Sequence, residues 1–495
     1  MICLSPAAGR ADWAQSFGIG QKSSNLGQAV TATADDYDAF YTNPAGAANF
    51  DAPFIGFGVK TLDTRQLDLR QTDVQTALPG GFPILVPGKD GLDLSPEETL
   101  TNSDIAIVPS AGGYAPIPGA ENIVVGIGVG VPFLVAANFG NDEDPGNYGK
   151  FNVTDAAIVV VEVSPTLAIK VNDRLNVGAS VGVTTFKYLK LEQDFGTRLG
   201  TPSLASVGIE TDSDVGLPVS PWEFQTAPLD VSFTLGAQYQ LTDRLRVGVT
   251  YRSETPETFE GGVNVAALGF LNFEDRFKFE AELPRHLQLG LAYQATPALM
   301  LSADARWTNW SATKGFGSPA EIKVTEGNID VFDAIGLGSI LGAPVESLTI
   351  NYDAQDTVSL HFGAAYKLTP AFELQMGYVY DPSFMPEDAA DLITTSSNRH
   401  ILSLGGEYKK QGASGQWTFN AGGQLILYED RTIDANESAT AGGVNTIIED
   451  LLVGEPDLEY KRNILGGFDI GGYVWSVGAS LSYRFNGAKD PLEPR

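Results

Sequence analysis

"YVWSVGASLSYRF", residues 473–485, alternates strictly between large apolar side chains and mostly small or polar ones. The apolar row has aromatic residues at both ends and consists of Tyr473, Trp475, Val477, Ala479, Leu481, Tyr483 and Phe485. Successive side chains of a strand point to opposite faces, so the whole row would lie on one face. An apolar face bounded by aromatic rings is typical of a strand that crosses a lipid bilayer, because Tyr and Trp favour the two interfaces.

The same alternation recurs along the chain and predicts fourteen strands. They are expected at 54–70, 104–116, 122–134, 156–171, 174–192, 228–241, 244–260, 274–294, 298–310, 356–368, 371–383, 399–410, 416–430 and 473–485. The connections alternate between short ones with turn-forming residues, such as VNDR and LTDR, and long ones. An even number of strands with every long loop at one end predicts an all-β fold, a 14-stranded antiparallel transmembrane β-barrel.

The charge of the chain is concentrated in the expected long loops. The net charge is −30, although only 19% of the residues are charged. The loops contain 30 acidic and 8 basic residues, and they are 71–103, 135–155, 195–227, 261–273, 311–355, 384–398 and 431–472. Two interpretations stay open: contact with lipopolysaccharide through divalent cations, or simple solubility of exposed loops. Nucleic acid is not an expected partner, because the chain lacks the basic patches that phosphates need.

Neither catalysis nor a cofactor is expected. His286, His361 and His400 are scattered and show no catalytic or metal-binding spacing. The acidic stretch NDEDPGN at 141–147 lacks the alternating ligand positions of a calcium loop. We therefore predict that the protein is not an enzyme and holds no metal ion.

The two ends of the chain carry separate expectations. Residues 1–13 contain small residues typical of a signal-peptidase site but no apolar core, so they are interpreted as the remnant of a signal peptide or as an ordinary terminus. Residues 486–495 follow the last strand and are expected to form a periplasmic tail. No run of 18 apolar residues predicts a transmembrane helix.

The stretch NIVVGIGVGVPFL at 122–134 is unusual for a barrel strand. Gly126, Gly128 and Gly130 share one face and Pro132 follows them. Proline lacks a ladder donor and glycine marks a bend or a close approach. Two readings stay open: a purposeful kink or gap in the wall, or room for a plug inside the barrel.

Several segments, in order, resemble the FadL family of outer-membrane transporters for long-chain fatty acids and other hydrophobic compounds. SSNLGQAVTATADDYDAFYTNPAG at 23–46 is similar to the family's N-terminal hatch, and VGVPFL at 129–134 is similar to its third strand. VEVSPTLAIKVNDRLNVGASVGV at 161–183 looks like a later barrel segment. The resemblance covers nearly the whole chain.

The resemblance implies a division into parts and a set of functional residues. A hatch at 14–52 would plug a barrel at 53–485. Within the hatch, the structural motif would be Asn43, Pro44, Ala45 and Gly46, and the residues nearest a ligand pocket would be Phe17, Ile19 and Leu26. The kink that opens the wall sideways would consist of Gly126, Gly128, Gly130, Pro132 and Phe133. The plain alternative for the Asn43–Gly46 motif is a linker before the first strand.

These features predict passive uptake of hydrophobic small molecules across the outer membrane of a Gram-negative bacterium. Long-chain fatty acids are the default substrate, with hydrocarbons and aromatics as further candidates. The expected partners are the ligand, outer-membrane lipid, lipopolysaccharide and the barrel assembly machinery, and the chain is expected to be a monomer. The alternatives are a general porin for polar solutes, favoured by lumen faces rich in Ser and Gly, or a surface barrel whose acidic loops carry the function.

Overall fold

The computed structural model describes thirteen parts of the chain. They are residues 18–63, 67–71, 77–78, 82–83, 105–138, 155–195, 205–211, 230–267, 271–326, 347–350, 352–386, 396–433 and 468–485. The expected signal-peptide remnant, Phe17, the stretch 141–147 and the C-terminal tail lie outside these parts, as does much of the expected long loops.

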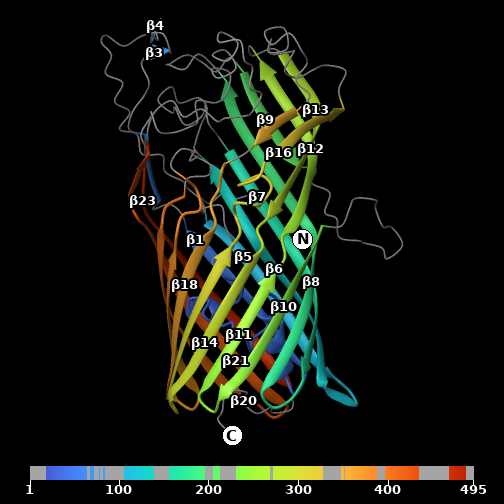
Figure 1. Cartoon of the computed structure of the whole chain (residues 1–495), viewed down its shortest axis with the longest axis vertical. Helices are drawn as coiled ribbons and strands as arrows, with labels where there is room; N and C mark the ends of the chain where they lie inside the picture. Colours follow the sequence, from blue (N-terminus) through green and yellow to red (C-terminus); the bar gives the residue numbers. More distant parts are fainter. Residues whose placement is uncertain are drawn as a thin grey trace.

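Fourteen antiparallel strands close into a barrel (Figure 1). Around the barrel they are β1 (Phe54–Asp63), β5 (Ile105–Ile117), β6 (Ala120–Asn138), β7 (Asp155–Lys170), β8 (Leu175–Phe195), β10 (Val231–Thr242), β11 (Leu245–Arg252), β14 (His286–Thr296), β15 (Leu299–Thr308), β18 (Thr357–Thr369), β19 (Phe372–Asp381), β20 (Arg399–Gln411), β21 (Gly415–Tyr428) and β23 (Phe468–Phe485). Each strand pairs with the next, and β23 closes the ring by pairing with β1. The predicted fold class is confirmed.

Further strands lengthen the wall on the side of the long loops. They are β2 (Leu67–Gln71), β9 (Ala205–Thr211), β12 (Thr255–Ala267), β13 (Leu271–Leu283), β16 (Ala320–Glu326), β17 (Ser347–Ile350) and β22 (Arg431–Ile433), and β3 (Ala77–Leu78) pairs separately with β4 (Phe82–Pro83). These strands correct the sequence-based boundaries.

The predicted strands 244–260 and 274–294 are each two strands. The first is interrupted at 253–254, between β11 and β12, and the second at 284–285, between β13 and β14. Pro284 explains the second break, because proline cannot donate to a ladder. Much of the expected loop 261–273 also belongs to the β12–β13 hairpin.

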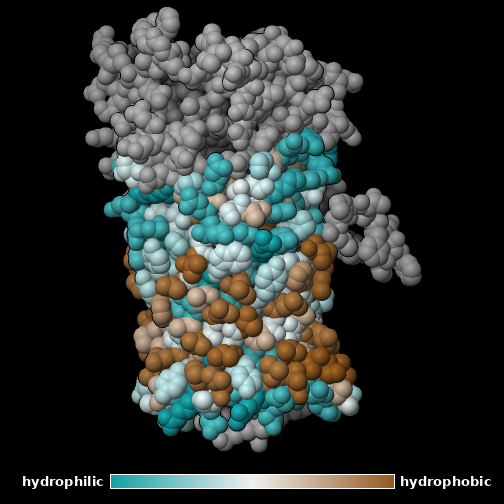
Figure 2. All heavy atoms as spheres, in the orientation of Figure 1, coloured by the Kyte–Doolittle hydropathy of each residue, from teal (hydrophilic) through white to brown (hydrophobic). Residues whose placement is uncertain are grey.

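The outer wall of the barrel is a lipid-facing surface. Figure 2 shows an apolar band around the lower half of the wall, with hydrophilic residues above and below it. Leu404 has 58% of its surface exposed, whereas its neighbour Ser403 is buried, as the predicted alternation requires. So large an exposed apolar band would be unstable in water, and lipid accounts for it. None of the helices in the described parts is long and apolar enough to cross a membrane.

Residues 18–52, hereafter the inner segment, fold inside the barrel (Figure 1). They form α1 (Gln21–Asn25), α2 (Ala39–Thr42) and the 3-10 helix η1 (Pro44–Asn49). Nearly every residue of the segment is buried. Helix α1 packs on β19, β20 and β21, whereas η1 packs on β7, β8 and β10 on another part of the wall. The inner segment therefore spans the lumen.

A belt of glycines on the inner wall makes this packing possible. On every one of the fourteen strands except β7 and β15, an inward-facing glycine leaves space that an inner-segment residue occupies. This glycine belt consists of Gly56, Gly58, Gly112, Gly128, Gly130, Gly178, Gly236, Gly248, Gly290, Gly363, Gly377, Gly405, Gly422 and Gly478. Several of its members are cross-strand partners, such as Gly405 and Gly422, so the belt is nearly continuous. Side chains at these positions would push the inner segment away from the wall.

Candidate functional site

The Asn43–Gly46 motif fastens the inner segment to the wall. The Asn43 side chain is fully buried, and its Nδ2 donates to the carbonyl of Thr31 at 2.7 Å and to that of Ala237 on β10 at 3.2 Å. Its Oδ1 accepts from the backbone N–H of Ala45 at 3.1 Å and so caps η1, with Pro44 at the first helical position. A Cβ at Gly46 would collide with the carbonyl of Ala34, which explains the glycine.

The barrel wall has a gap in its backbone pairing between β5 and β6. These strands pair only between Ala111–Ile117 and Ala120–Val129. Beyond that point, residues 105–110 pair with β1 and residues 130–138 pair with β7. Within residues 105–138, all of which the structure describes, no ladder pairing joins these two stretches. We call this break the β5–β6 gap.

Strand β6 is also irregular beside the gap. Its register against β7 shifts between Gly130 and Phe133, so that Val131 and Pro132 together face Val161. An extra residue of this kind bends a strand, and Pro132 has no N–H to donate. Phe133, next along the strand, is buried.

The three glycines of β6 serve packing inside the barrel. A Cβ on Gly126 would overlap the ring of Tyr114, one on Gly128 would overlap the ring of Phe40, and one on Gly130 would lie 2.8 Å from Ile19. The glycines make room for aromatic and inner-segment side chains, and Pro132 lies in the irregularity.

A cavity borders the β5–β6 gap from inside. It has a volume of about 10 Å³ and is lined by Val108 and Ser110 of β5, Val131 of β6, and Ile19 of the inner segment, among others. Lys60 of β1 also lines it, and its ammonium donates to the carbonyl of Gly18. We call it the gap cavity.

A larger cavity of about 40 Å³ lies against β15, β18, β19 and β20. Its aromatic wall is formed by Trp310 and Phe384, whose rings stack at 4.1 Å. Its polar wall includes Arg306 and the ion pair between Arg399 and Asp381. We call it the outer cavity.

A third cavity, of about 10 Å³, lies between the inner segment and β14 and β15. Ile19, Tyr41 and His286 line it, and we call it the inner cavity. It shares Gln28 and Arg306 with the outer cavity and Ile19 with the gap cavity. The three cavities therefore follow one another along the inner segment.

A strip of buried apolar side chains runs along the inner wall, over consecutive strands, from the outer cavity to the gap cavity. Val379 and Ile401 line the outer cavity, and Val108 and Val131 line the gap cavity. All four belong to one packed cluster, the apolar strip, whose other buried members are Leu62, Ala106, Ile426, Tyr428 and Val474. The strip ends at the β5–β6 gap.

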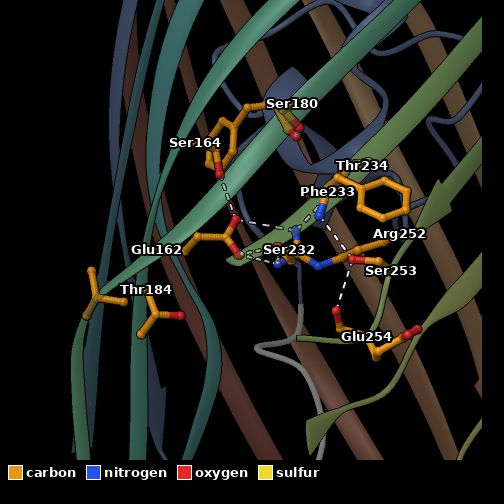
Figure 3. Close-up of polar contacts among 12 residues, drawn as sticks. Glu162, Ser164, Ser180, Thr184, Ser232, Phe233, Thr234, Arg252, Ser253 and Glu254 are labelled. Atoms are coloured by element: carbon orange, nitrogen blue, oxygen red, sulfur yellow. Dashed lines mark hydrogen bonds and ion pairs between the residues drawn. The ribbon is translucent and has the colours of Figure 1, made fainter. Parts of the chain in front are cut away.

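A buried ion pair lies on the other side of the β6 irregularity (Figure 3). Glu162 of β7 pairs with Arg252 of β11, and Figure 3 shows its carboxylate also accepting hydrogen bonds from Ser164, at 2.6 Å, and Ser232, at 3.1 Å. The guanidinium of Arg252 lies 4.9 Å from the ring centre of Tyr41 in the inner segment. The charges are paired and hydrogen-bonded, as buried charges must be. The network ties β7, β10 and β11 to the inner segment.

Comparison with known proteins identifies the family. A model of the outer membrane transport proteins named OMPP1/FadL/TodX matches residues 7–450. The chain belongs to this FadL/TodX family. Among curated proteins, none matches it.

Solved structures of FadL/TodX-type proteins share the fold over nearly their whole length. A FadL homologue of Pseudomonas aeruginosa is 19% identical, with a TM-score of 0.65, 96% of this chain covered and 100% of that one. The toluene transporter TbuX of Ralstonia pickettii is 15% identical, with a TM-score of 0.59 and coverages of 95% and 99%. The toluene transporter TodX of P. putida is 14% identical, with the same TM-score and coverages.

Family membership and the lipid-facing band agree on location. The protein is an outer-membrane β-barrel, as predicted, and the FadL/TodX family is one of transport proteins rather than enzymes. Among the described residues, no group of three or more His, Cys, Asp or Glu side chains lies together so as to hold a metal ion.

The structure separates the expected pocket residues of this FadL/TodX-family chain. Ile19 lines two of the cavities, whereas Leu26 packs against Val30 and Ala365 by the wall. Phe17 lies outside the described residues.

The apolar strip was missed by sequence reasoning, although a signal existed. Val474 is the one large apolar residue on the otherwise small and polar face of 473–485, and it is fully buried in the strip. Ile401 interrupts a polar inward row in the same way, between Arg399 and Ser403. Large apolar residues within otherwise polar, lumen-facing rows were therefore the sequence signal for the apolar strip.

Proposed function

We propose that this chain takes up hydrophobic small molecules passively across the outer membrane and releases them sideways through the β5–β6 gap. Long-chain fatty acids are the default substrate. The apolar strip carries the proposal, because it links a cavity on the loop side of the inner segment to the place where the wall is unpaired.

The strip suits a molecule that avoids water. Each buried Å² of apolar surface is worth about 25 cal/mol, so a ligand lying on Ile426 and Val474 keeps part of the stabilisation that it has in lipid. At the gap cavity, the ligand meets a wall whose outer face carries Ile107 and Val129, rather than an aqueous exit. Such a route needs no nucleotide, because the ligand ends in an environment at least as favourable as the strip.

The solved structures support a broad substrate class. Two of them are described as toluene transporters, and the fold they share with this chain accommodates a small aromatic hydrocarbon. Hydrocarbons and aromatics therefore stay candidates beside fatty acids. The stacked pair Trp310 and Phe384, both almost fully buried, gives the outer cavity an apolar aromatic edge that suits either kind of molecule.

Making the strip polar tests the proposal. The double variant Val474→Thr and Ile401→Thr places two hydroxyls in the strip; threonine has nearly the shape of valine and is one carbon smaller than isoleucine. Initial uptake of radiolabelled oleate and toluene, measured in cells lacking their own transporter, should fall by about tenfold, which corresponds to roughly 1.4 kcal/mol of lost stabilisation along the route. The control is Val477→Thr, on the same strand but facing lipid.

Unchanged uptake in the double variant, with normal amounts of folded barrel, would rule out the strip as the route. A similar loss in the Val477→Thr control would indicate a general defect of the barrel rather than a blocked path.

A further inference from the structure

Gln28 of the inner segment has a backbone conformation that is costly for a residue with a side chain. Among the described residues, Gln28, with φ 60°, and Asp353, with φ 50°, are the only non-glycine residues with positive φ. Residues in this region cluster at functional sites when the surrounding structure holds them there. Gln28 is so held: its N–H donates to the carbonyl of Ser23 at 2.7 Å, and its own carbonyl accepts from Nε2 of Gln288 at 3.2 Å.

This conformation directs the Gln28 side chain toward the cavities. Every other residue from 18 to 34 is buried, whereas Gln28 is only partly buried. Its Cγ lies 3.1 Å from the position that a Cβ on Gly18 would take, so the Gln28 side chain packs against Gly18 at the start of the inner segment. Its Oε1 accepts from a terminal guanidinium nitrogen of Arg306 at 3.3 Å.

The Gln28–Arg306 pair forms a wall between two cavities. Both residues line the outer cavity and both line the inner cavity. Arg306 is also held in place, because its Nε donates to Oε1 of Gln288 at 2.8 Å. The terminal atoms of the Gln28 side chain can move without breaking a backbone hydrogen bond of the barrel, because their hydrogen bond is the one to the Arg306 side chain.

The inner cavity contains a buried polar atom that a ligand could satisfy. His286 lines it with only 3% of its surface exposed, and in the described part of the chain its Nδ1 has no hydrogen-bond partner. A buried polar atom without a partner is costly, so a ligand with a polar group would gain a hydrogen bond there. Passage to His286 from the outer cavity leads past Gln28.

The structure assigns to Gln28 the role of an internal gate between the outer and inner cavities. Its amide, held on Arg306, keeps the passage closed, and swinging it aside opens the passage. The side chain at position 28 thereby sets which molecules reach the inner cavity. The effect on uptake rests on the proposed function, whereas the gate itself does not.

Thiol labelling tests the gate without any transport assay. In full-length protein in which the single cysteine is removed by Cys3→Ser, Thr42→Cys places a thiol in the inner cavity and Thr357→Cys places one in the outer cavity. A small methanethiosulfonate reagent is added to the loop side of the barrel in liposomes. Each cysteine is combined with Gln28→Gly, which removes the gate, and with Gln28→Glu, which binds Arg306 more tightly through a charge-assisted hydrogen bond.

We expect labelling at position 42 to become several-fold faster with Gln28→Gly and several-fold slower with Gln28→Glu, while labelling at position 357 stays the same. Equal rates at position 42 in all three backgrounds would overturn the gate. If wild-type protein takes up no hydrophobic compound but labelling follows this pattern, the proposed function fails and the gate stands.

A stability measurement separates gating from loosening. Glycine accepts positive φ without cost, so Gln28→Gly should leave the thermal unfolding midpoint unchanged or raise it. Faster labelling with a lowered midpoint would mean that the inner segment has loosened, and would count against the gate. Asp353→Gly is the matched control: it relieves the same backbone conformation and should leave labelling at position 42 unchanged.

Discussion

Single buried polar side chains hold the inner segment in the barrel. Asn43 joins the carbonyls of Thr31 and Ala237, and Asn25 of α1 donates to Gln375 of β19 at 2.9 Å. Each such hydrogen bond contributes a net free energy of about 1 kcal/mol to stability. Removing one partner costs more, about 1–3 kcal/mol, because it leaves a buried polar atom unsatisfied. The sequence showed the turn chemistry of Asn43, whereas its wall partners, some 200 residues away, follow only from the closed barrel.

Asp38 makes the stability of the inner segment depend on pH. Burial, together with the neighbouring carboxyl of Asp36, raises the pKa of Asp38 to about 8, and its carboxyl hydrogen-bonds to Ser23. The folded protein therefore binds a proton that the unfolded chain releases above pH of about 4. Stability from this group is present at low pH and is lost as the pH rises toward 8.

We predict that the thermal unfolding midpoint decreases as the pH is raised from 5 to 8. The decrease should be at most about 1–2 °C per pH unit, because a loss of 1 kcal/mol shifts the Tm of a large domain by only a few degrees. Asp38→Asn, which mimics the protonated acid, should flatten this part of the profile. Asp35→Asn is the control for removing a nearby carboxylate, here the one paired with Lys22 at 2.9 Å. A wild-type midpoint that rises with pH, or an Asp38→Asn profile identical to that of the wild type, would contradict the assignment.

The positions of the barrel strands could be predicted from the sequence, because a single pattern governs them. Period-two alternation located all fourteen barrel strands, because lipid outside and lumen inside impose it. It did not show the breaks at 253–254 and 284–285, since alternation continues across them. Pro132 left a gap in the wall open as one interpretation, but the extent of the β5–β6 gap did not follow, because a strand's sequence does not say where its neighbour stops pairing.

The glycine belt accounts for part of the high glycine content, which period-two alternation does not explain. The chain has 55 glycines, and those of the belt lie where backbone meets backbone inside the barrel. Gly422→Val should force Asn25 and α1 off the wall, because a Cβ there overlaps the Asn25 side chain. We expect steady ion conductance in planar bilayers to appear or to rise well above that of wild type.

The control for this variant is Gly262→Val on β12, where an added Cβ meets nothing within 4 Å. It should leave conductance at the wild-type level. An unchanged conductance in Gly422→Val, with the barrel correctly folded, would show that the inner segment does not depend on the belt for closing the lumen.

At the scale of the whole molecule, the barrel combines a filled lumen with an interrupted wall. The inner segment occupies the level of the glycine belt, and the apolar strip runs past it to the β5–β6 gap. The small, polar lumen faces that favoured a porin in the sequence are mostly covered by the inner segment. The sequence did not show the apolar strip, because the strip forms only where residues from seven strands meet in one cluster.

Tethering the two sides of the gap tests sideways release most directly. Val108 of β5 and Val131 of β6 both line the gap cavity and pack in the apolar strip. With both replaced by cysteine in the Cys3→Ser background, a short bifunctional methanethiosulfonate reagent joins the strands reversibly. We predict that oleate uptake falls steeply on cross-linking and returns after reduction, while either single-cysteine variant treated in the same way keeps its uptake. Undiminished uptake through a fully cross-linked gap would contradict sideways release.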